Sequence, residues 1–240
     1  EFKREIASLI SFARNDIKES PVAPQCHCEE SRAESRDDEA ISIGIESNLI
    51  GRHNAYNILA SIAAAIALGM DLKDIKIGVE ALKGIPGRLE SVDCGRNFSV
   101  YVDYAHTEDG LEKALKSLRE LKPGKLISVF GCGGNRDRFK RPRMGKISTE
   151  LCDMVFITSD NPRNEVPVDI INEIVKGISP KKNNYISEPD RFVAIKKALA
   201  EAREGDIVLV AGKGHETYQI FKDTTIPFDD REVVKRILML

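Results

Sequence analysis

The feature of this sequence that most constrains its fold is a regular alternation, from residue 98 onward, of short apolar runs with longer amphipathic segments. The apolar runs cover residues 98–104, 125–130, 154–157 and 206–212, and the first alternates apolar and polar residues with the period of a strand. Strands that are separated by helices and short joints favour a parallel sheet covered on both faces. We therefore predict an α/β fold with a mostly parallel sheet.

The amphipathic segments between the apolar runs are predicted to be helices. Leucines recur at helical spacing over residues 108–121, at Leu111, Leu115, Leu118 and Leu121. Further helices are expected around 143–151, over 167–178 from a starting proline to Gly177, along the stripe Phe192, Ile195, Leu199 and Ala202, and from a cap at Asp229 or Asp230 through Leu238.

Residues 47–90 predict a pair of helices followed by a turn. The sequence GRHNAYNILASIAAAIALGM (51–70) predicts a helix that Asn54 caps and Gly69 ends, and its alanine content predicts a tightly packed, buried helix. A second helix is expected over 71–85 and a turn over 85–90. The pair is typical of the end of a domain whose front half is missing or reduced here.

Residues 1–46 have a different character. A short charged segment, 1–18, is followed by residues 20–42, which combine prolines and a dense charge cluster with almost no apolar periodicity. We interpret 20–42 as an exposed loop or a disordered insert. The sequence Cys26-His27-Cys28 raises a zinc hypothesis, but its spacing is poor for a tetrahedral site and no second ligand pair follows.

Composition narrows the functional class. The 240 residues are 42% hydrophobic and 31% charged, as in a globular protein that buries a core, and the net charge of −2 gives no field that attracts nucleic acid. No apolar run approaches the length of a membrane span, and the first residues do not form a secretory signal. Five cysteines do not suggest a disulfide framework. We expect a cytoplasmic protein with no membrane and no nucleic-acid partner.

Each predicted strand ends at a cluster of polar or charged residues and, in two cases, glycines. These clusters are DYAHT (103–107), FGCGGNRDRFKRPRMG (130–145), SDNPR (159–163) and GKGHE (212–216). The carboxyl ends of parallel strands lie at one edge of a sheet, where ligands bind in such folds. The sequence therefore predicts a site built from these four loops.

The glycine-rich loops carry no complete nucleotide-binding signature. Gly131–Gly134 resembles a dinucleotide fingerprint, but Arg136 stands at its sixth position and no ribose-binding acid follows at the expected distance. GKGHE resembles half of a P-loop, and no complete P-loop sequence occurs in the 240 residues. The basic residues Arg138, Lys140, Arg141 and Arg143 are read as a mostly solvated loop.

Candidates for chemistry with protons or sulfur are few. His106 and His215 stand at strand ends, where histidine serves either acid–base work or loop anchoring. Cys94, Cys132 and Cys152 form no metal pattern, and nothing in the sequence pairs Cys132 with a base. We predict no metal ligand and no certain catalytic residue.

Six ordered motifs resemble those of a known family: GRHNAYNILAS, GIPGRLE, DYAHT, FGCGGNRDRFKRPRMG, TSDNPR and GKGHE. In order and spacing they resemble the Mur ligases of peptidoglycan synthesis, within them the MurE group, over about residues 47–240. The family has a central ATP-binding domain followed by a Rossmann-like C-terminal domain that receives the incoming amino acid. The resemblance implies that 47–90 form the end of the central domain and 91–240 the C-terminal domain.

The resemblance also implies roles for matching positions. On the ATP side it implies adenine contacts from Asn54 and Asn57, near His53, and ribose and phosphate contacts from Arg88, Asp103 and His106. At the amino-acid site it implies Arg136, Asp160, Asn161, Pro162, Arg163, Gly212 and Glu216.

The form DNPR (160–163) resembles the version of the family that selects meso-diaminopimelate over lysine. Diaminopimelate differs from lysine by a distal carboxylate, which Arg163 can pair bidentately, while Glu216 takes an ammonium group. Lysine would leave the guanidinium unmatched, at a cost of roughly 1–3 kcal/mol. The implied reaction is ATP-dependent addition of diaminopimelate to UDP-MurNAc-L-Ala-D-Glu, with Mg²⁺ as a further cofactor.

The sequence departs from the family in several respects. The UDP-binding domain, the P-loop, the magnesium-binding acids and the carbamylated lysine of the family have no match here, and Glu108 stands where the family favours proline. We expect a fragment that does not ligate alone and whose missing N-terminal half is a possible partner.

Other functions are also compatible with the sequence. The chain could be a binding module for an acidic amino acid or a non-functional remnant, or a Mur ligase that adds lysine or glutamate. A nicotinamide-dependent oxidoreductase rests on GCGG alone.

Overall fold

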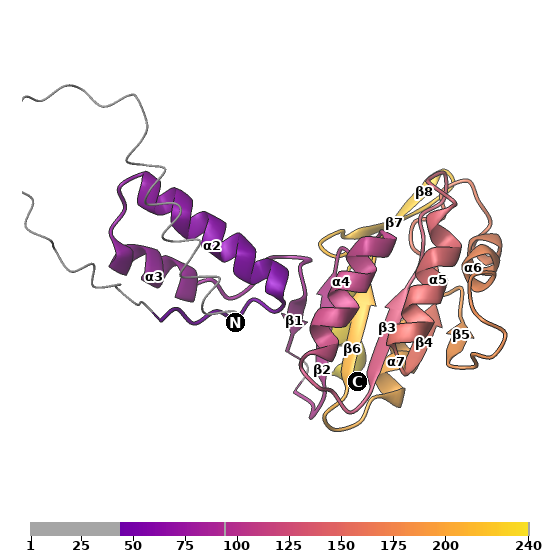
Figure 1. The fold of residues 1–240 in the computed structure, drawn as a ribbon. Helices are drawn as coiled ribbons and strands as arrows, with labels where there is room; N and C mark the ends of the chain where they lie inside the picture. The colour runs from indigo at the N-terminus through magenta and orange to yellow at the C-terminus, as the bar shows by residue number, and fades with distance from the viewer. Residues whose placement is uncertain (1–43, 94, 240) are drawn as a thin grey trace, which may run out of the picture. The chain divides into compact units, whose positions relative to one another are not determined.

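The computed structural model describes residues 44–93 and 95–239, in two compact units (Figure 1). The first unit includes residues 44–48 and 52–83, and the second 49–51 and the described residues from 84 onward. The predictions for 1–18, for 20–42 with its Cys26-His27-Cys28 sequence, and for Cys94 lie outside the described residues. The units divide between residues 83 and 84, and the domain limits 1–46, 47–90 and 91–240 stay predictions.

The first unit contains the two predicted helices, α2 (Arg52–Ala67) and α3 (Leu72–Glu80). Asp71 caps α3, its side chain accepting from the backbone N–H of Lys73 at 2.7 Å. The prediction that Asn54 caps α2 is wrong, because the helix begins at Arg52 and a cap residue must precede the helical backbone. Gly69 follows the helix with a φ of +79°, as predicted.

The prediction that α2 is buried does not hold in the described unit. Only Asn54 and Ile62 of this helix are buried there, while Tyr56 and the following Leu68 are exposed. Alanine permits close helix packing, but among the described residues of this unit α3 is the helix that α2 contacts. Alanine content by itself therefore did not determine burial.

The second unit is built on a six-stranded sheet in the order β1-β2-β6-β3-β4-β5. β1 pairs antiparallel with β2, and every other pairing is parallel, so the predicted mostly parallel sheet is confirmed. The strands are β1 (Glu90–Val92), β2 (Ser99–Asp103), β3 (Leu126–Phe130), β4 (Met154–Ile157), β5 (Tyr185–Ser187) and β6 (Ile207–Ala211).

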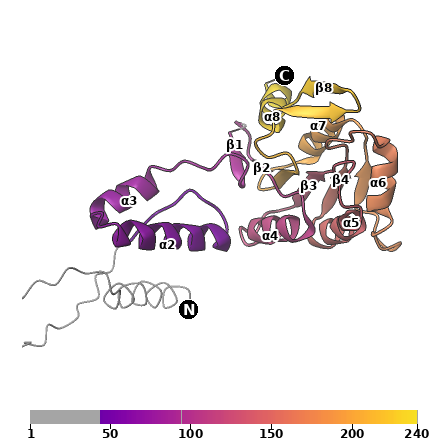
Figure 2. The same cartoon turned by 90° about the horizontal axis from the view of Figure 1, so that it is seen from above.

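Helices cover both faces of this sheet (Figure 2). On one face lie α4 (Glu108–Arg119), α5 (Lys140–Leu151) and α6 (Pro167–Val175), and on the other lie α7 (Arg191–Glu201) and α8 (Asp230–Leu238). Successive strand residues point to opposite faces: Phe130 belongs to the core under α4, and Val129 to the core under α7. The architecture is the predicted α/β fold.

Burial in β2 differs from the predicted alternation. The strand buries four successive residues from Val100 to Asp103, because its two faces are both covered by helices. In α4 the leucine stripe is buried as expected at Leu111, Leu115 and Leu118, while Leu121 is exposed because the helix ends at Arg119.

Side chains at the helix starts follow the sequence signals. Pro167 stands in the first turn of α6, and Asp229 caps α8 by accepting from the backbone N–H of Arg231 at 2.9 Å.

A hairpin that the sequence analysis did not predict, β7 (Tyr218–Phe221) with β8 (Thr224–Pro227), stands between β6 and α8 along the chain. In the described ranges, no helix combines the length and apolarity needed to cross a bilayer.

Candidate functional site

Four loops lie next to one another at the carboxyl edge of the sheet. Their strands are adjacent and parallel in the order β2, β6, β3, β4, so the loops that follow them, 103–107, 212–216, 131–139 and 158–163, occupy the same edge in that order. Gly134 shows how closely two of them cross, because a Cβ at this position would lie 1.8 Å from the carbonyl oxygen of Pro162. The predicted meeting of the four loops is confirmed.

Arg163 has an unusual backbone that the β7–β8 hairpin holds. Its φ is +51°, a left-handed conformation that costs free energy for a residue with a side chain unless its surroundings fix it. Its N–H donates to the carbonyl of Ile220 at 3.0 Å, and its own carbonyl accepts from the N–H of Lys222 at 2.7 Å. These two hydrogen bonds to the hairpin therefore fix the position of the Arg163 backbone, from which the side chain extends.

The Arg163 guanidinium lies against the loop that carries Arg136. Its Nη1 donates to the carbonyl oxygens of Gly134 at 3.0 Å and Asn161 at 3.3 Å. A Cβ on Gly133 would lie 2.9 Å from this Nη1 and 3.6 Å from Cγ of Arg136, so both arginines border the same glycine. In the part of the chain that the structure describes, both hydrogen bonds of this guanidinium use Nη1, and none uses Nε or Nη2.

A buried lysine that the sequence analysis did not single out lies at the centre of a polar group. We call Asp160, Asn161, Lys213 and Glu216 the lysine cluster. Lys213 is fully buried, and its Nζ donates to Asn161 Oδ1 at 3.2 Å and to Glu216 Oε2 at 3.3 Å. Asn161 Nδ2 also donates to Glu216 Oε2, at 2.9 Å. The only signal for it in the sequence is the lysine of GKGHE, a sequence that resembles half of a P-loop.

Asp160 belongs to the interior of the lysine cluster. Burial raises the pKa of its carboxyl group, and the nearby charges of Arg191 and Lys213 act against that rise. Oδ1 lies 3.6 Å from Lys213 Nζ, while Oδ2 would lie 3.2 Å from a Cβ on Gly212. Gly212 therefore lets the β6 loop pass directly beside this carboxylate.

A buried ion pair holds the ends of strands β4 and β6. Arg191, at the start of α7, donates to both carboxylate oxygens of Asp230 at 2.8 and 2.7 Å, and both side chains are fully buried. The same guanidinium donates to the carbonyls of Ser159 at 3.3 Å and Ala211 at 3.0 Å. Arg191 thus ties the ends of β4 and β6 to α8, a role that the sequence pattern did not indicate.

Arg141 corrects the interpretation of the basic loop. Arg138 and Arg143 are exposed as expected, but Arg141 is fully buried, so the solvated reading is wrong for it. It donates to both carboxylate oxygens of Glu165 at 2.8 Å and to the carbonyl of Gly133 at 3.2 Å. These bonds lower the pKa of Glu165 to about 2. The loops of Gly133 and Arg163 are therefore joined by a charged network.

Asp103, predicted to reach a nucleotide, already holds two backbone groups. Its Oδ2 accepts from the N–H of Leu89 at 2.7 Å and its Oδ1 from the N–H of Ala105 at 2.8 Å. The N–H of Tyr104 donates to the carbonyl of Gly87 at 2.8 Å. These bonds fasten the GIPGRLE turn to the end of β2.

The turn places Arg88 next to a group of rings. We call Arg88, Tyr104, His106 and His215 the tyrosine cluster. The ring centroid of Tyr104 lies 4.7 Å from that of His106 and 5.3 Å from that of His215, and the Arg88 guanidinium carbon lies 5.8 Å from it. Both histidines and Arg88 are exposed, so this cluster offers an aromatic and cationic surface to a ligand.

Asn54 and Asn57 belong to the first unit, on α2. Asn54 is buried and Asn57 exposed, and Asn57 Nδ2 lies 3.5 Å from Asn54 Oδ1. The structure thus brings together the predicted residues of the second unit, from Arg88 to Glu216, at one sheet edge. The roles implied for all of them stay predictions.

The cysteines and carboxylates offer no further chemistry at this edge. Burial raises the pKa of Cys132 to about 12, and its Sγ lies 3.7 Å from the sulfur of Met144, as in a packed core residue. Among the residues that the structure describes, no group of three or more His, Cys, Asp or Glu side chains is placed to hold a metal ion. These residues therefore do not by themselves fit a bound Mg²⁺.

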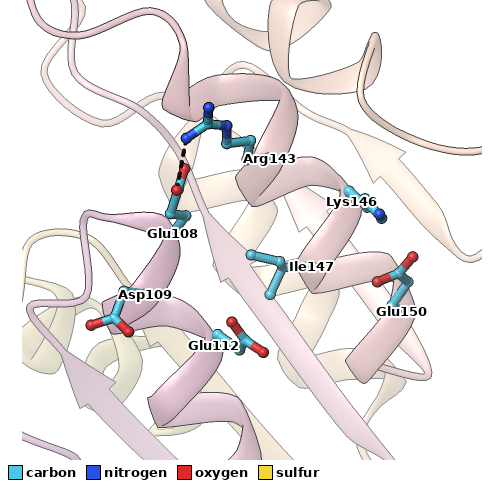
Figure 3. Close-up of a pocket in the computed structure, with 7 residues that line it drawn as sticks. All are labelled: Glu108, Asp109, Glu112, Arg143, Lys146, Ile147 and Glu150. Carbon is cyan, nitrogen blue, oxygen red and sulfur yellow. Dashed lines mark hydrogen bonds and ion pairs between the residues drawn. The ribbon is translucent and has the colours of Figure 1, made fainter.

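A surface hollow lies between α4 and α5 (Figure 3). Its lining comes entirely from these two helices, with Glu108, Asp109, Glu112 and Glu150 beside Arg143, Lys146 and Ile147. Arg143 Nη1 donates to Glu108 Oε1 at 2.9 Å across the hollow. Its charges are those of an ordinary ion-paired helix surface.

Comparisons with known proteins agree with this geometry. The profile of the family described as "Mur ligase, glutamate ligase domain" matches residues 87–214. A UDP-N-acetylmuramoyl-L-alanyl-D-glutamate–2,6-diaminopimelate ligase of Clostridium tetani is 54% identical over 81% of this chain and 40% of its own length. The Clostridium perfringens protein of the same name is 44% identical over 98% of this chain and 48% of its own, so that match extends N-terminal to residue 47.

A solved structure gives the same result. It is titled as a UDP-N-acetylmuramoyl-L-alanyl-D-glutamate–2,6-diaminopimelate ligase and is 39% identical, with a TM-score of 0.65 over 81% of this chain and 40% of that one. The chain thus spans between 40% and 48% of the length of these relatives. The matched region covers more than half of the 240 residues and carries all four edge loops except the end of the last, so this chain belongs to the Mur ligase family.

Proposed function

We propose that this chain serves a Mur ligase that joins meso-diaminopimelate to UDP-MurNAc-L-Ala-D-Glu with ATP, and that its second unit receives the diaminopimelate. The names of the relatives at 44–54% identity support this proposal. The chain spans about 40% of the relatives' length, so we assign to it the reception of the amino acid and not the whole reaction.

The observation that carries the proposal is the placement of Arg163. Its guanidinium is anchored through Nη1, which leaves the edge formed by Nε and Nη2 for the distal carboxylate of diaminopimelate. The neighbouring Arg136 adds a second positive charge at the same loop. Lysine has no carboxylate at that end, so it would leave the guanidinium without its anion.

Glu216 and Asn161 supply the complementary polarity. Both bonds that Glu216 accepts within the lysine cluster end on Oε2, and its Oε1 is available for an ammonium group. Asp160, Pro162 and Gly212 shape this site by holding the loops close together. The arrangement recognises a group that carries both an acid and an amine.

The proposed reaction begins with phosphorylation of the acceptor carboxylate by ATP. The amine of diaminopimelate then attacks the acyl phosphate, the amide bond forms, and phosphate leaves. The residues of this chain would contribute by positioning and charge, since no covalent nucleophile is needed. We propose that Arg88 and His106 of the second unit contact ATP, while the adenine contacts implied for Asn54 and Asn57 of the first unit stay predictions. We assign no protein ligand here to the accompanying Mg²⁺.

Calorimetry with the 240-residue chain tests the substrate. We expect meso-diaminopimelate to bind at least about 10-fold more tightly than L-lysine, because a hydrogen-bonded charge contributes roughly 1.5–3 kcal/mol. Arg163→Ala should remove this preference, and Arg163→Lys should restore it only in part because lysine lacks the bidentate fork. Arg143→Ala, at an exposed arginine of α5, is the matched control and should bind as the unaltered chain does.

Two results would contradict the proposal. Equal affinities for lysine and diaminopimelate would favour a Mur ligase with another amino acid, and absence of heat with both would favour a remnant. Release of phosphate from ATP, with the UDP-dipeptide and diaminopimelate present, tests the separate expectation that the chain does not ligate alone.

A further inference from the structure

Lys213 is a charged side chain with no exposed surface. Burying an ammonium group is costly unless anions and hydrogen-bond acceptors surround it. Three groups do so here: Asp160 Oδ1 at 3.6 Å, Asn161 Oδ1 at 3.2 Å and Glu216 Oε2 at 3.3 Å. Lys213 presents no surface to a ligand in this structure, and its contacts are with these neighbours.

The contacts of Lys213 determine how Asn161 is oriented. Asn161 Oδ1 accepts from Lys213 Nζ and, at 3.1 Å, from the backbone N–H of Ile220. With its oxygen held by two donors, the amide can only present its NH₂ group to Glu216, and Nδ2 donates to Glu216 Oε2 at 2.9 Å. Lys213 and the Ile220 N–H thus fix the direction of the amide together.

The same contacts determine which oxygen of Glu216 is occupied. Lys213 and Asn161 both donate to Oε2, so the carboxylate is gripped from one side. Without Lys213, the buried guanidinium of Arg191 would be left to compensate the charges of both Asp160 and Glu216. Neighbouring carboxylates repel each other, so the loss of the lysine would favour another orientation of Glu216.

We propose that Lys213 is a positioning residue of the amino-acid site: it holds the Glu216 carboxylate in one orientation, so that Oε1 meets the ammonium group of the incoming amino acid. The inference rests on the proposed function, and it goes further by assigning the discrimination of the ammonium group to a residue that does not touch the substrate. Lys213 acts on Glu216 directly and through the orientation of Asn161.

A double-mutant cycle measured by calorimetry with meso-diaminopimelate tests this role. Lys213→Met and Glu216→Gln should each weaken binding by about 10-fold or more. Because Lys213 acts through Glu216, the double variant should bind within about 2-fold of Glu216→Gln alone. Effects that multiply would overturn the proposal, since a lysine with a merely structural role would add its own loss. Lys213→Arg keeps the charge and should recover part of the affinity.

Two further variants provide a control and an alternative background for the double-mutant cycle. Lys197→Met removes an exposed lysine that pairs with Glu188 and should leave binding unchanged. If Lys213→Met does not fold, Asp160→Asn with Lys213→Met removes the buried charge pair together, and the cycle is run in the Asp160→Asn background.

A measurement without ligand separates this inference from the proposed function. The side-chain amide protons of Asn161 should be protected from exchange in nuclear magnetic resonance spectra of the unaltered chain and exposed in Lys213→Met. Unchanged protection would overturn the positioning role, whether or not diaminopimelate binds. Protection that depends on Lys213 in a chain that binds no diaminopimelate would instead contradict the proposed function alone.

Discussion

The lysine cluster and the tyrosine cluster lie at the same sheet edge, yet they are built in opposite ways. In the lysine cluster, Lys213 and Asp160 are buried and held by side chains from two loops. In the tyrosine cluster, Arg88 and His106 are exposed, and both lie against the ring of Tyr104. One half of the edge is fixed before a ligand arrives, and the other half is open to one.

The difference reflects what each half is proposed to recognise. A small amino acid offers few atoms, so its recognition depends on charges that are already in place, because ordering them on binding would cost free energy. A nucleotide offers a large surface to rings and a guanidinium, which tolerate adjustment. The contrast teaches that buried charge pairs lie under one half of this edge, while exposed side chains form the other half.

The largest expected effect removes the support under the lysine cluster. Arg191→Met should lower the free energy of unfolding by about 3–5 kcal/mol, because Asp230 would be left charged and buried without its partner. Arg88→Met, in the tyrosine cluster, should change it by no more than about 0.5 kcal/mol. Urea unfolding of both variants measures the difference.

Pairing Arg191→Met with Asp230→Leu should restore much of the lost stability, because a buried ion pair replaced as a whole leaves no orphan charge. Equal losses for the Arg191 and Arg88 variants would break the comparison between the two clusters.

The next effect concerns the crossing of two loops. Gly134→Ala should destabilise the chain by on the order of 1–3 kcal/mol, because the new methyl group would lie 1.8 Å from the carbonyl oxygen of Pro162 and one loop must move. The movement should also weaken diaminopimelate binding. Gly84→Ala, with nothing within 4 Å of the added carbon, is the control and should be nearly neutral. Thermal unfolding reports stability, and unaltered affinity in Gly134→Ala would show that the crossing does not shape the site.

A smaller effect should appear with pH. Arg141 holds the pKa of Glu165 at about 2, below its ordinary value of 4.5, so the folded state favours the ionised form. The resulting stability is fully present above pH 4.5 and is lost as pH falls towards 2. Allowing for solvent screening, we expect about 1 kcal/mol from this group. Urea unfolding between pH 7 and 2.5 should show a smaller fall for Glu165→Gln than for the unaltered chain, and parallel curves would contradict it.

The smallest effect is expected in the tyrosine cluster. His106→Ala removes an exposed ring and its two contacts with Tyr104, one to the ring and one to the carbonyl oxygen, so the free energy of unfolding should change by less than about 0.5 kcal/mol. Calorimetric unfolding checks this value. A loss as large as that of Gly134→Ala would mean that the tyrosine cluster is also a structural unit, and the two halves of the edge would no longer differ.

The sequence allowed the sheet and the meeting of the loops to be predicted, because both follow from periodicity and parallel topology. It did not reveal the buried lysine, arginines and hairpin, since lysine and arginine are usually exposed and only tertiary contacts decide otherwise. Lys213, Arg141 and Arg191 each acquired partners from 20 or more residues away along the chain. Asn54 was assigned as a cap from residue type, although the helix starts before it.

The left-handed backbone of Arg163 has a consequence for protein engineering. Two main-chain hydrogen bonds from residues 220 and 222 keep that conformation, although these residues follow almost 60 positions later. Transplanting the tetrapeptide DNPR into a lysine-adding homologue would therefore transfer the sequence without the backbone conformation of the arginine. A successful graft needs the hairpin as its second half, and chimeras that exchange the two segments together should inherit the donor's choice of amino acid.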